Sequence, residues 1–492
     1  MEILILAVPF LWMFLFWITA RKWLLHLLNV LGTFILLGIA LSITCKVISA
    51  GHIIYPFLNS FFYLDELSVV MLDIMAIVGF MVSIFSIGYL NQKLLHQVID
   101  VKRIQLFYSL MYAFIFTMVL VVSTQNLGLM WIAIEATTLA SAFLVGFYND
   151  NACIEAAWKY VIICSVGIAL ALLGIVFLYI SAVNIFEGSK TSLNWLFLFQ
   201  NAKSLHGSVL KIAFIFVFVG FGTKAGLVPM HTWLPDAYSQ APAPISALLS
   251  GVLSSSAMYG IIRILAIVNK NLGNSHYTGN LLIAAGLLSI GTAAVCILTQ
   301  KDLKRILAYS SIEHMGIIAF GLGMFTANSL FATLFHMVNN AFTKALLFLA
   351  AGNVHLKYGT REISKITGLI AIIPITGLTF LLGLFAIAGV PPFSIFTSEL
   401  NMVIAAFSAN YFIQAVILIL FSASVFAGIA LVALKMFFGN CSNTEVKPGE
   451  TNGLGLSVLV ILLLIISVTG MLLPEGFKKL LESASGIIRG IV

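Results

Sequence analysis

The sequence predicts an all-α polytopic membrane protein with about fourteen transmembrane helices. Of its 492 residues, 61% are hydrophobic and only 9% are charged, whereas soluble proteins carry about 25% charged residues. Apolar stretches long enough to cross the bilayer core, which takes about 20 residues, recur from end to end. No long polar segment remains for a soluble domain.

The expected spans follow one another with short polar connections. They lie near residues 3–20, 24–45, 64–90, 105–123, 127–147, 153–181, 207–228, 242–268, 279–299, 303–324, 327–353, 369–405, 409–438 and 454–473. The first span lacks a basic leader and a small-residue cleavage site. We therefore expect a retained helix there and not a signal peptide.

Two spans contain helix-breaking residues. The seventh holds Gly220, Gly222 and Gly226, and the twelfth, too long for one straight helix, is interrupted at residues 389–392. Interrupted helices at corresponding positions of two halves are typical of inverted repeats with a site near the bilayer midplane. The predicted organisation is residues 1–104 as the first three helices, 105–268 as one five-helix repeat, 279–438 as an inverted second repeat, and 439–492 as the last helix and an amphipathic tail.

Basic residues in the connections set the expected orientation. Loops after odd-numbered spans hold 13 of them: Arg21, Lys22, Lys93, Lys102, Arg103, Lys301, Lys304, Arg305, Lys357, Arg361, Lys365, Lys435 and Lys447. The opposite face holds 7: Lys46, Lys190, Lys203, Lys270, Lys478, Lys479 and Arg489. The positive-inside rule puts the richer face in the cytoplasm. Both termini then lie outside a cell inner membrane.

The composition excludes several kinds of site. The five cysteines, Cys45, Cys153, Cys164, Cys296 and Cys441, form no CxxC and no His/Cys cluster, so we expect no metal site, iron–sulfur cluster or haem. The glycines at 220–226 follow no strand and do not match a nucleotide loop, so no cofactor is expected. The net charge of +7 resides in loops and does not indicate a nucleic-acid partner.

Two charged residues in the first half are expected to form a pair. Lys224 and Glu135 both lie inside apolar spans, where a charge costs roughly 2.5–3.5 kcal/mol on insertion scales. An ion pair at about 4 Å with an effective dielectric near 20 gains about 4 kcal/mol, which offsets much of that cost. The pair is a candidate proton carrier, and the alternative is a static ion pair that fixes packing.

His231 follows the seventh span in a proline-rich segment that includes Asp236. Because histidine titrates near neutrality, His231 is a candidate for proton exchange with the cytoplasm. The alternative is a rigid turn that Asp236 caps.

Further titratable residues lie on spans ten and eleven. Glu313 and His314 are adjacent and face different directions on a helix, so one is a candidate carrier while the other meets a neighbouring helix. His336, Asn340 and Lys344 are four residues apart and share one helix face. Such a stripe can hold a chain of waters, and the alternative is a core histidine that Asn340 satisfies.

Glu399 follows the break in the twelfth span, as Lys224 accompanies the break in the seventh. A carboxylate near the midplane is a candidate last station before a proton exit. The alternative is a local cap or pair.

Four segments resemble the antiporter-like membrane subunits of respiratory complex I, which are related to Mrp cation/proton antiporters and energy-converting hydrogenases. They are residues 211–237, 155–160, 304–316 and 358–362. The last three are most similar to the hydrogenase-4 component F branch, which is related to the formate hydrogenlyase membrane subunit. The resemblance implies a first-half pair of Glu135 and Lys224, and a relay through His336 and Lys344 to Glu399.

The sequence departs from the family pattern at two places. Many complex I relatives carry a second lysine on the eighth span, where this chain has serines at 254–256. Asn340 replaces the second histidine of the eleventh span. Serine and asparagine hold no proton at neutral pH, so Glu313 or His314 is expected to replace the missing carrier.

The leading hypothesis is a proton-translocating, non-catalytic membrane subunit of a redox-driven complex of the hydrogenase-4, formate hydrogenlyase or complex I type. Its expected partners are other membrane and peripheral subunits, the lipid bilayer and protons, with sodium as an alternative ion. A second interpretation is an Mrp-type cation/proton antiporter subunit. A third is a non-conducting membrane anchor for a hydrogenase or carbon-uptake partner.

Overall fold

The computed structural model describes residues 3–54, 61–186, 193–438 and 446–490. Within this part of the chain, twelve helices are long and apolar enough to cross a membrane, with Ala243–Leu272 counted as one. Three shorter apolar helices, Leu4–Leu15, Pro374–Ile387 and Ser394–Ser408, accompany them. The predicted fold class, an all-α polytopic membrane protein, is confirmed. The sequence did not predict one short antiparallel hairpin, β1 (His52–Ile54) with β2 (Tyr63–Asp65).

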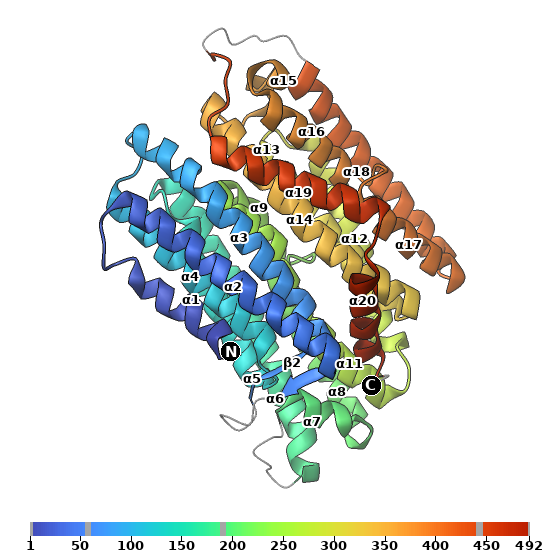
Figure 1. Ribbon diagram of the computed structural model, residues 1–492. Helices are drawn as coiled ribbons and strands as arrows, with labels where there is room; N and C mark the ends of the chain where they lie inside the picture. Colours follow the sequence, from blue (N-terminus) through green and yellow to red (C-terminus); the bar gives the residue numbers. More distant parts are fainter. Residues whose placement is uncertain (1–2, 55–60, 187–192, 439–445, 491–492) are drawn as a thin grey trace.

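The helices form one elongated bundle (Figure 1). In chain order they are α1 (Leu4–Leu15), α2 (Lys22–Ala50), α3 (Glu66–Leu95), α4 (Val101–Ser123), α5 (Leu127–Val145), α6 (Asn151–Phe186), α7 (Trp195–Gln200), α8 (Gly207–Ala225), α9 (Trp233–Gln240), α10 (Ala243–Leu248), α11 (Ser254–Leu272), α12 (His276–Thr299), α13 (Leu303–Met324), α14 (Ala327–Tyr358), α15 (Leu369–Ile372), α16 (Pro374–Ile387), α17 (Ser394–Ser408), α18 (Phe412–Phe438), α19 (Gly453–Met471) and α20 (Glu475–Arg489).

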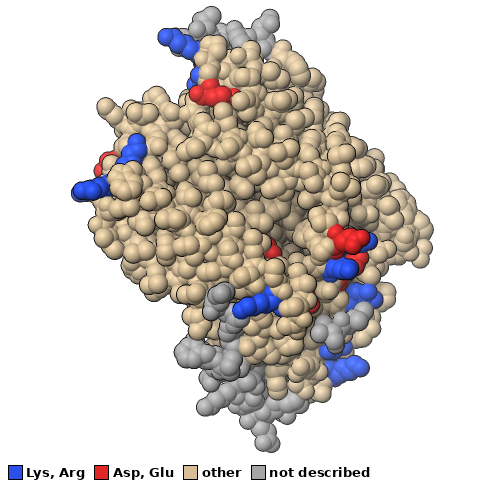
Figure 2. Space-filling model, viewed as in Figure 1, with Lys and Arg blue, Asp and Glu red and all other residues tan. Residues whose placement is uncertain are grey.

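Burial divides these helices into an inner and an outer set. The most hydrophobic windows of α13, α14 and the α10–α11 helix are 94%, 100% and 100% buried, whereas those of α18 and α19 are each 28% buried. On the face shown in Figure 2, charged side chains gather near the two ends of the long helices and leave an almost uncharged surface between them. The polar residues of the inner helices therefore lie inside the bundle at membrane depth.

Both predicted helix breaks are present. Helix α8 ends at Ala225 because Gly226 adopts a left-handed conformation with φ of 88°, and α9 begins at Trp233. The helix continues through Gly220 and Gly222, so only the last of the three predicted glycines marks the break. The twelfth predicted span divides into α16 and α17, and residues 388–393 separate them.

One irregular turn interrupts the helix that continues from α10 into α11. Residues 249–253 form a π-helical turn immediately before the serines at 254–256. The Tyr238 hydroxyl donates to the carbonyl oxygen of Leu249 at 2.9 Å. Single π turns occur frequently at functional sites, and this one immediately precedes the serines that stand where the family pattern has a lysine.

Candidate functional site

Lys224 lies in the last turn of α8, and its side chain is completely buried. Its Nζ donates hydrogen bonds to Thr138 Oγ1 at 2.7 Å and to the Tyr160 hydroxyl at 2.6 Å. The ammonium is also 4.6 Å from the centre of the Tyr160 ring. Two hydroxyl oxygens and an aromatic face thus replace part of the hydration that burial removes.

Glu135, on α5, is linked to this lysine through a hydroxyl group. Ser165 donates to Glu135 Oε1 at 2.7 Å, and Thr138 donates to Oε2 at 3.4 Å. The Thr138 hydroxyl therefore lies between the carboxylate and the lysine. The expected direct ion pair is absent, since no carboxylate oxygen of the described residues lies within 4.0 Å of Lys224 Nζ. Glu135 is half-buried, whereas Lys224 is completely buried.

His231 lies in the break between α8 and α9 and is half-buried. Its Nδ1 is buried and has no hydrogen-bond partner among the described residues. Burial lowers the pKa of His231 below its ordinary value, which favours a neutral ring at pH 7. The structure does not join His231 to Lys224 by a hydrogen bond.

Asp236 is fixed in an ion-pair network. It lies 2.9 Å from Arg305 and 3.3 Å from Lys159, and Lys159 also pairs with Glu155 at 2.6 Å. Asp236 lies inside α9 and links it to α6 and α13, and it does not cap the helix.

Two basic residues that were predicted to lie in loops hold the C-terminal end of α9, and Arg361 does lie in a loop. Lys304 is buried in the first turn of α13. It donates to the carbonyl oxygens of Ser239 and Ala241 at 3.2 and 2.6 Å. Arg361 donates to the same Ser239 oxygen at 2.5 Å. Cations suit helix C-termini, and the end of α9 provides these carbonyl oxygens.

Hydroxyl groups occupy the middle of the molecule, between the two halves. Ser250, on the π turn, is hydrogen-bonded to Ser311 of α13 at 2.8 Å. Tyr238 is hydrogen-bonded to Ser254 at 2.8 Å. Ser255 donates to the carbonyl of Gly251 at 3.1 Å within its own helix. The region that lacks the family lysine is thus polar, but none of these groups titrates near neutrality.

Lys344, on α14, is the fully buried lysine of the second half. Its Nζ donates to Ser310 Oγ and, at 3.1 Å, to the carbonyl oxygen of Leu307. Ser310 and Ser311 thus make the interhelical hydrogen bonds expected of α13. Glu313 follows one turn after Ser310 and is 3% exposed. Its Oε2 is buried without a hydrogen-bond partner in the described part of the chain.

His314, His336 and Glu399 come together from α13, α14 and α17. His314 Nδ1 lies 2.9 Å from His336 Nε2 and 3.9 Å from Glu399 Oε1. Both histidines are completely buried, and the Glu399 side chain is 21% exposed. The sequence predicted all three residues as path members but did not predict that they meet.

The hydrogen bonds favour one pair of histidine tautomers. Ser398 Oγ donates its one hydrogen to the carbonyl of Ile395 at 2.8 Å, so it accepts from His336 Nδ1–H at 2.9 Å. A neutral His336 therefore carries a lone pair on Nε2, and His314 Nδ1–H donates to it. His336 Nε2 is ready to accept a proton.

Buried polar atoms without partners concentrate in this second half. They include both side-chain amide atoms of Asn340, Asn339 Oδ1, Glu313 Oε2 and Ser394 Oγ. Buried polar groups that lack protein partners are usually hydrogen-bonded to ordered water. Asn340 lies midway between His336 and Lys344 on α14, and eight residues of helix span about 12 Å.

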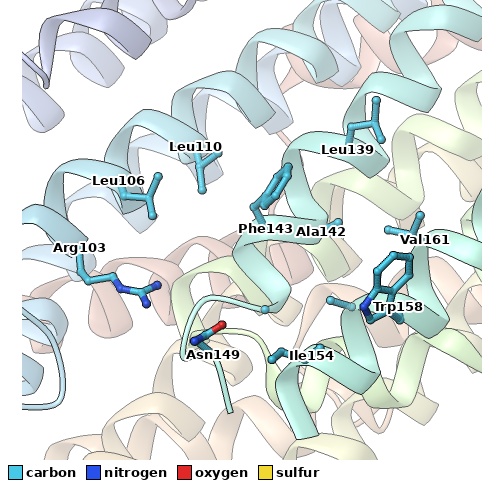
Figure 3. A pocket seen from close by; sticks show the side chains of 12 residues that line it. Arg103, Leu106, Leu110, Leu139, Ala142, Phe143, Asn149, Ile154, Trp158 and Val161 are labelled. Carbon is cyan, nitrogen blue, oxygen red and sulfur yellow. The ribbon is translucent and has the colours of Figure 1, made fainter. Parts of the chain in front are cut away.

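A groove runs along the outer face of α4, α5 and α6 (Figure 3). It encloses about 760 Å³ and is lined mainly by apolar side chains, with Arg103 and Asn149 as polar residues. Leu139, in its wall, is 55% exposed and follows Glu135 by one helical turn. The groove thus leads along α5 toward the half-buried carboxylate.

A family model described as the transmembrane part of NADH:quinone oxidoreductase and Mrp antiporters matches residues 124–427, more than half of the chain. The chain belongs to this family of antiporter-like membrane subunits. A second family model, the N-terminus of complex I chain 5, matches residues 58–94. The resemblance predicted from the sequence motifs is therefore confirmed, and the chain is a multi-pass membrane protein.

Curated family members include subunits of several assemblies. The hydrogenase-4 component F homolog of Methylacidiphilum infernorum is 39% identical over 352 residues, which cover 72% of this chain and 74% of the relative. Hydrogenase-4 component B of Escherichia coli is 29% identical, with 68% of this chain and 49% of the relative covered. The Na(+)/H(+) antiporter subunit A1 of Staphylococcus haemolyticus is 30% identical, with 88% and 55% covered. The chain thus spans about half the length of the last two.

Solved structures of family members share the fold over nearly the whole chain. A chain of the membrane-bound sulfane sulfur reductase, an archaeal respiratory membrane complex, has a TM-score of 0.87 at 25% identity, with 99% of this chain and 97% of that chain covered. A chain of the Mrp complex from Dietzia sp. has a TM-score of 0.85 at 20% identity, with 100% and 99% covered. Both of these chains therefore belong to membrane complexes.

Sequence reasoning missed the side chains that connect the predicted residues. Thr138 was detectable, because it follows Glu135 by three residues and shares its helix face. Tyr160, Ser165 and Ser398 carry no spacing signal, because their partners lie on other helices.

Proposed function

We propose that this chain carries protons across the membrane as a subunit of a redox-driven complex. The observation that carries the proposal is a pair of fully buried lysines, Lys224 and Lys344, both held by neutral hydrogen-bond acceptors. A lysine without a bound counter-charge loses its proton more readily than one in an ion pair. Each can therefore alternate between a charged and a neutral state as its surroundings change.

In the first half, we assign proton exchange to Glu135, Thr138 and Lys224. Thr138 accepts from Lys224 and donates to Glu135, so its hydroxyl can pass a proton between them by exchanging one hydrogen for another. Movement of a neighbouring subunit near Glu135 would change the charge that Lys224 experiences. Energy from redox chemistry elsewhere in the complex would enter the chain in this way.

In the second half, we assign the route to Lys344, His336 and Glu399, with waters beside Asn340 as the connection. Nε2 of His336 accepts a proton, and its Nδ1–H is already bound to Ser398. Glu399, with a partly exposed side chain, is the last station. Glu313 is the proposed carrier that replaces the family lysine of the central helix. His314 orients the acceptor nitrogen, and His231 exchanges protons with the cytoplasm.

The proposed organisation follows the two broken helices. Residues 105–268 and 279–438 form two inverted repeats, 1–104 supply three further helices, and 439–492 supply the last helix and the tail. Both termini lie at the same end of the bundle in Figure 1, which supports an even number of crossings. We place that end outside the cell inner membrane.

A neighbouring membrane subunit docks on the groove of α4–α6 in this proposal. Glu135 faces outward among exposed apolar side chains such as Ile132 and Leu139, which are 53% and 55% exposed. A carboxylate facing lipid would be costly, so the expected occupant is a transmembrane helix with a polar or basic group opposite Glu135.

Leu139→Trp should reduce copurification of that subunit, whereas Leu288→Trp, at a leucine 53% exposed on α12, should not. Equal recovery would argue against this interface.

The decisive test is Lys224→Ala in the assembled complex, reconstituted in proteoliposomes with a pH-sensitive dye. We expect redox turnover to continue while proton uptake falls to the background leak. Lys211→Ala, which removes an exposed lysine from the same helix, should pump at the wild-type rate. Wild-type pumping by Lys224→Ala would overturn the proposal.

A second candidate is an Mrp-type cation/proton antiporter subunit. The match to the staphylococcal Na(+)/H(+) antiporter subunit, over 462 residues, favours it. Sodium-dependent proton exchange without any electron donor would select this function over the first.

A further inference from the structure

The cluster of His314, His336 and Glu399 has the composition of a metal site. One ligand atom from each residue lies within 4.8 Å of the other two. No metal-binding motif is visible in the sequence, because the three residues come from three helices and their spacing matches no known pattern. The fold alone assembles two imidazoles and a carboxylate in one buried place.

Neighbouring groups orient one of the two histidines as they do in metal sites, whereas His314 Nε2 has no hydrogen-bond partner among the described residues. Ligating histidines almost always donate their other ring N–H to a hydrogen-bond acceptor. His336 donates Nδ1–H to Ser398, and Ser398 is itself fixed by the Ile395 carbonyl. The Nε2 lone pair of His336 thus points at His314 Nδ1, in the space that a metal ion would occupy.

We propose that His314 Nδ1, His336 Nε2 and Glu399 Oε1 bind a divalent transition-metal ion, with Zn²⁺ as the best match. Zinc takes nitrogen ligands at about 2.0–2.1 Å and carboxylate oxygens at about 2.0–2.2 Å, usually as a tetrahedron. Two nitrogens of such a tetrahedron lie roughly 3.3 Å apart, and the present separation is 2.9 Å. A separation of the two rings by a few tenths of an ångström provides this geometry. The proton on His314 Nδ1 moves to Nε2 of the same ring, so that Nδ1 presents a lone pair to the ion.

The donor set selects the class of ion. Imidazole suits zinc, copper and nickel, whereas magnesium, calcium and manganese prefer oxygen ligands. Three protein ligands leave a fourth position for water.

Gly389 and the partly exposed Glu399 provide access. A Cβ atom on Gly389 would lie 2.7 Å from Glu399 Oε2. The glycine therefore leaves room for the carboxylate beside the break that separates α16 from α17.

A bound ion would also stop proton passage in the second half, and this part rests on the proposed function. Coordination occupies the Nε2 lone pair on His336, which is the atom proposed to accept the proton. The ion is thus an inhibitor of transport and not a structural metal.

Equilibrium dialysis of the purified, metal-free full-length chain against Zn²⁺ tests the site without any proton gradient. We expect one zinc per chain, and at least about 100-fold weaker binding for His314→Asn, His336→Asn and Glu399→Gln. His231→Asn, which removes a half-buried histidine outside the cluster, should bind as the wild type does. Wild-type affinity in all three cluster variants, or no zinc on the wild type, would overturn the site.

A second variant covers the possibility that a substitution only disturbs folding. His336→Cys keeps a zinc ligand, so it should recover Co²⁺ binding and add a thiolate-to-cobalt absorption band. Absence of both in a variant that elutes as wild type would count against the site.

Proton uptake in proteoliposomes separates the two proposals. We expect half-inhibition at the zinc concentration that half-fills the site in dialysis. Zinc binding with undiminished uptake would overturn the inhibition, whereas normal uptake by Lys224→Ala would overturn the proton path and leave the dialysis result intact.

Discussion

Lys224 and Lys344 are both completely buried, yet their surroundings differ. Lys224 donates to two side-chain hydroxyls, and Thr138 connects it to a carboxylate at the outer face of the bundle. Lys344 donates to Ser310 and to a backbone carbonyl, and the polar atoms around it are enclosed and partly unsatisfied. The first site is thus compact and reaches the protein surface. The second is internal and contains buried polar atoms that have no hydrogen-bond partner among the described residues.

The difference indicates a division of labour within one chain. A carboxylate at the edge, such as Glu135, responds to a neighbouring subunit. An enclosed group of imidazole, amide and carboxyl side chains suits storage and forwarding of a proton. Proton passage under this division needs both halves in series, and the substitutions below test whether they behave so.

Lys344→Ala has the largest expected effect. Proton uptake should fall to the leak, as for Lys224→Ala, because a charge that crosses hydrocarbon without a carrier meets a steep cost. Dye-based uptake with intact redox turnover measures this. Half of the wild-type rate would show instead that the two halves are parallel channels.

Glu135→Gln should reproduce the loss seen with Lys224→Ala, and the double variant should be no worse than either single variant. Groups that act as one unit are non-additive in a double-mutant cycle. Initial uptake rates of the four proteins provide the cycle. Losses that multiply would mean that Glu135 and Lys224 act separately.

Glu313→Gln should cut uptake strongly, since Glu313 is the buried carboxyl group proposed to replace the missing lysine. Adding Ser255→Lys should recover part of the rate by placing a carrier on the central helix. Ser256→Lys, one residue away on a different helix face, is the matched control. A well-folded Glu313→Gln protein that pumps normally would remove Glu313 from the path.

Thr138→Val has the smallest expected effect, a slowing of about tenfold or more. It removes the hydroxyl that accepts from Lys224 and donates to Glu135, and one hydrogen bond to a charged group is worth about 1.5–3 kcal/mol. Thr138→Ser keeps the hydroxyl and should pump normally. Ser310, the hydroxyl residue that binds Lys344, makes no hydrogen bond to a carboxylate of the described residues, so the same test cannot be made in the second half. Unchanged uptake in the valine variant would mean that Glu135 and Lys224 communicate without Thr138.

Much of the fold was predictable because the bilayer constrains it. Span lengths follow from membrane thickness, and Gly226 and Pro391 mark breaks that the structure contains. The predicted buried titratable residues were visible for the same reason, since charge in an apolar stretch is conspicuous. The roles assigned to them remain predictions.

The contacts between those residues were not predictable from spacing. Periodicity describes one helix at a time, whereas Lys224, Tyr160 and Ser165 come from different helices or turns. For the same reason the sequence did not predict the buried ion pair of Arg263 with Asp65, in which the two N–O distances are 2.6 and 2.7 Å. Positive-inside counting also treated Lys304 as a loop residue, although its side chain holds backbone carbonyls.

The π turn at residues 249–253 changes the rotation of α11 about the helix axis relative to α10. On its own turn, Gly251 packs so closely on α14 that a Cβ atom would lie 2.8 Å from the Ala341 carbonyl oxygen. Beyond it, Arg263 locks α11 onto Asp65. Deleting one residue from the turn would restore α-helical winding and rotate one end by about 100° relative to the other. The contact of Gly251 with α14 and the ion pair of Arg263 with Asp65 could then not form together. The extra residue in the π turn therefore allows one helix to make both contacts.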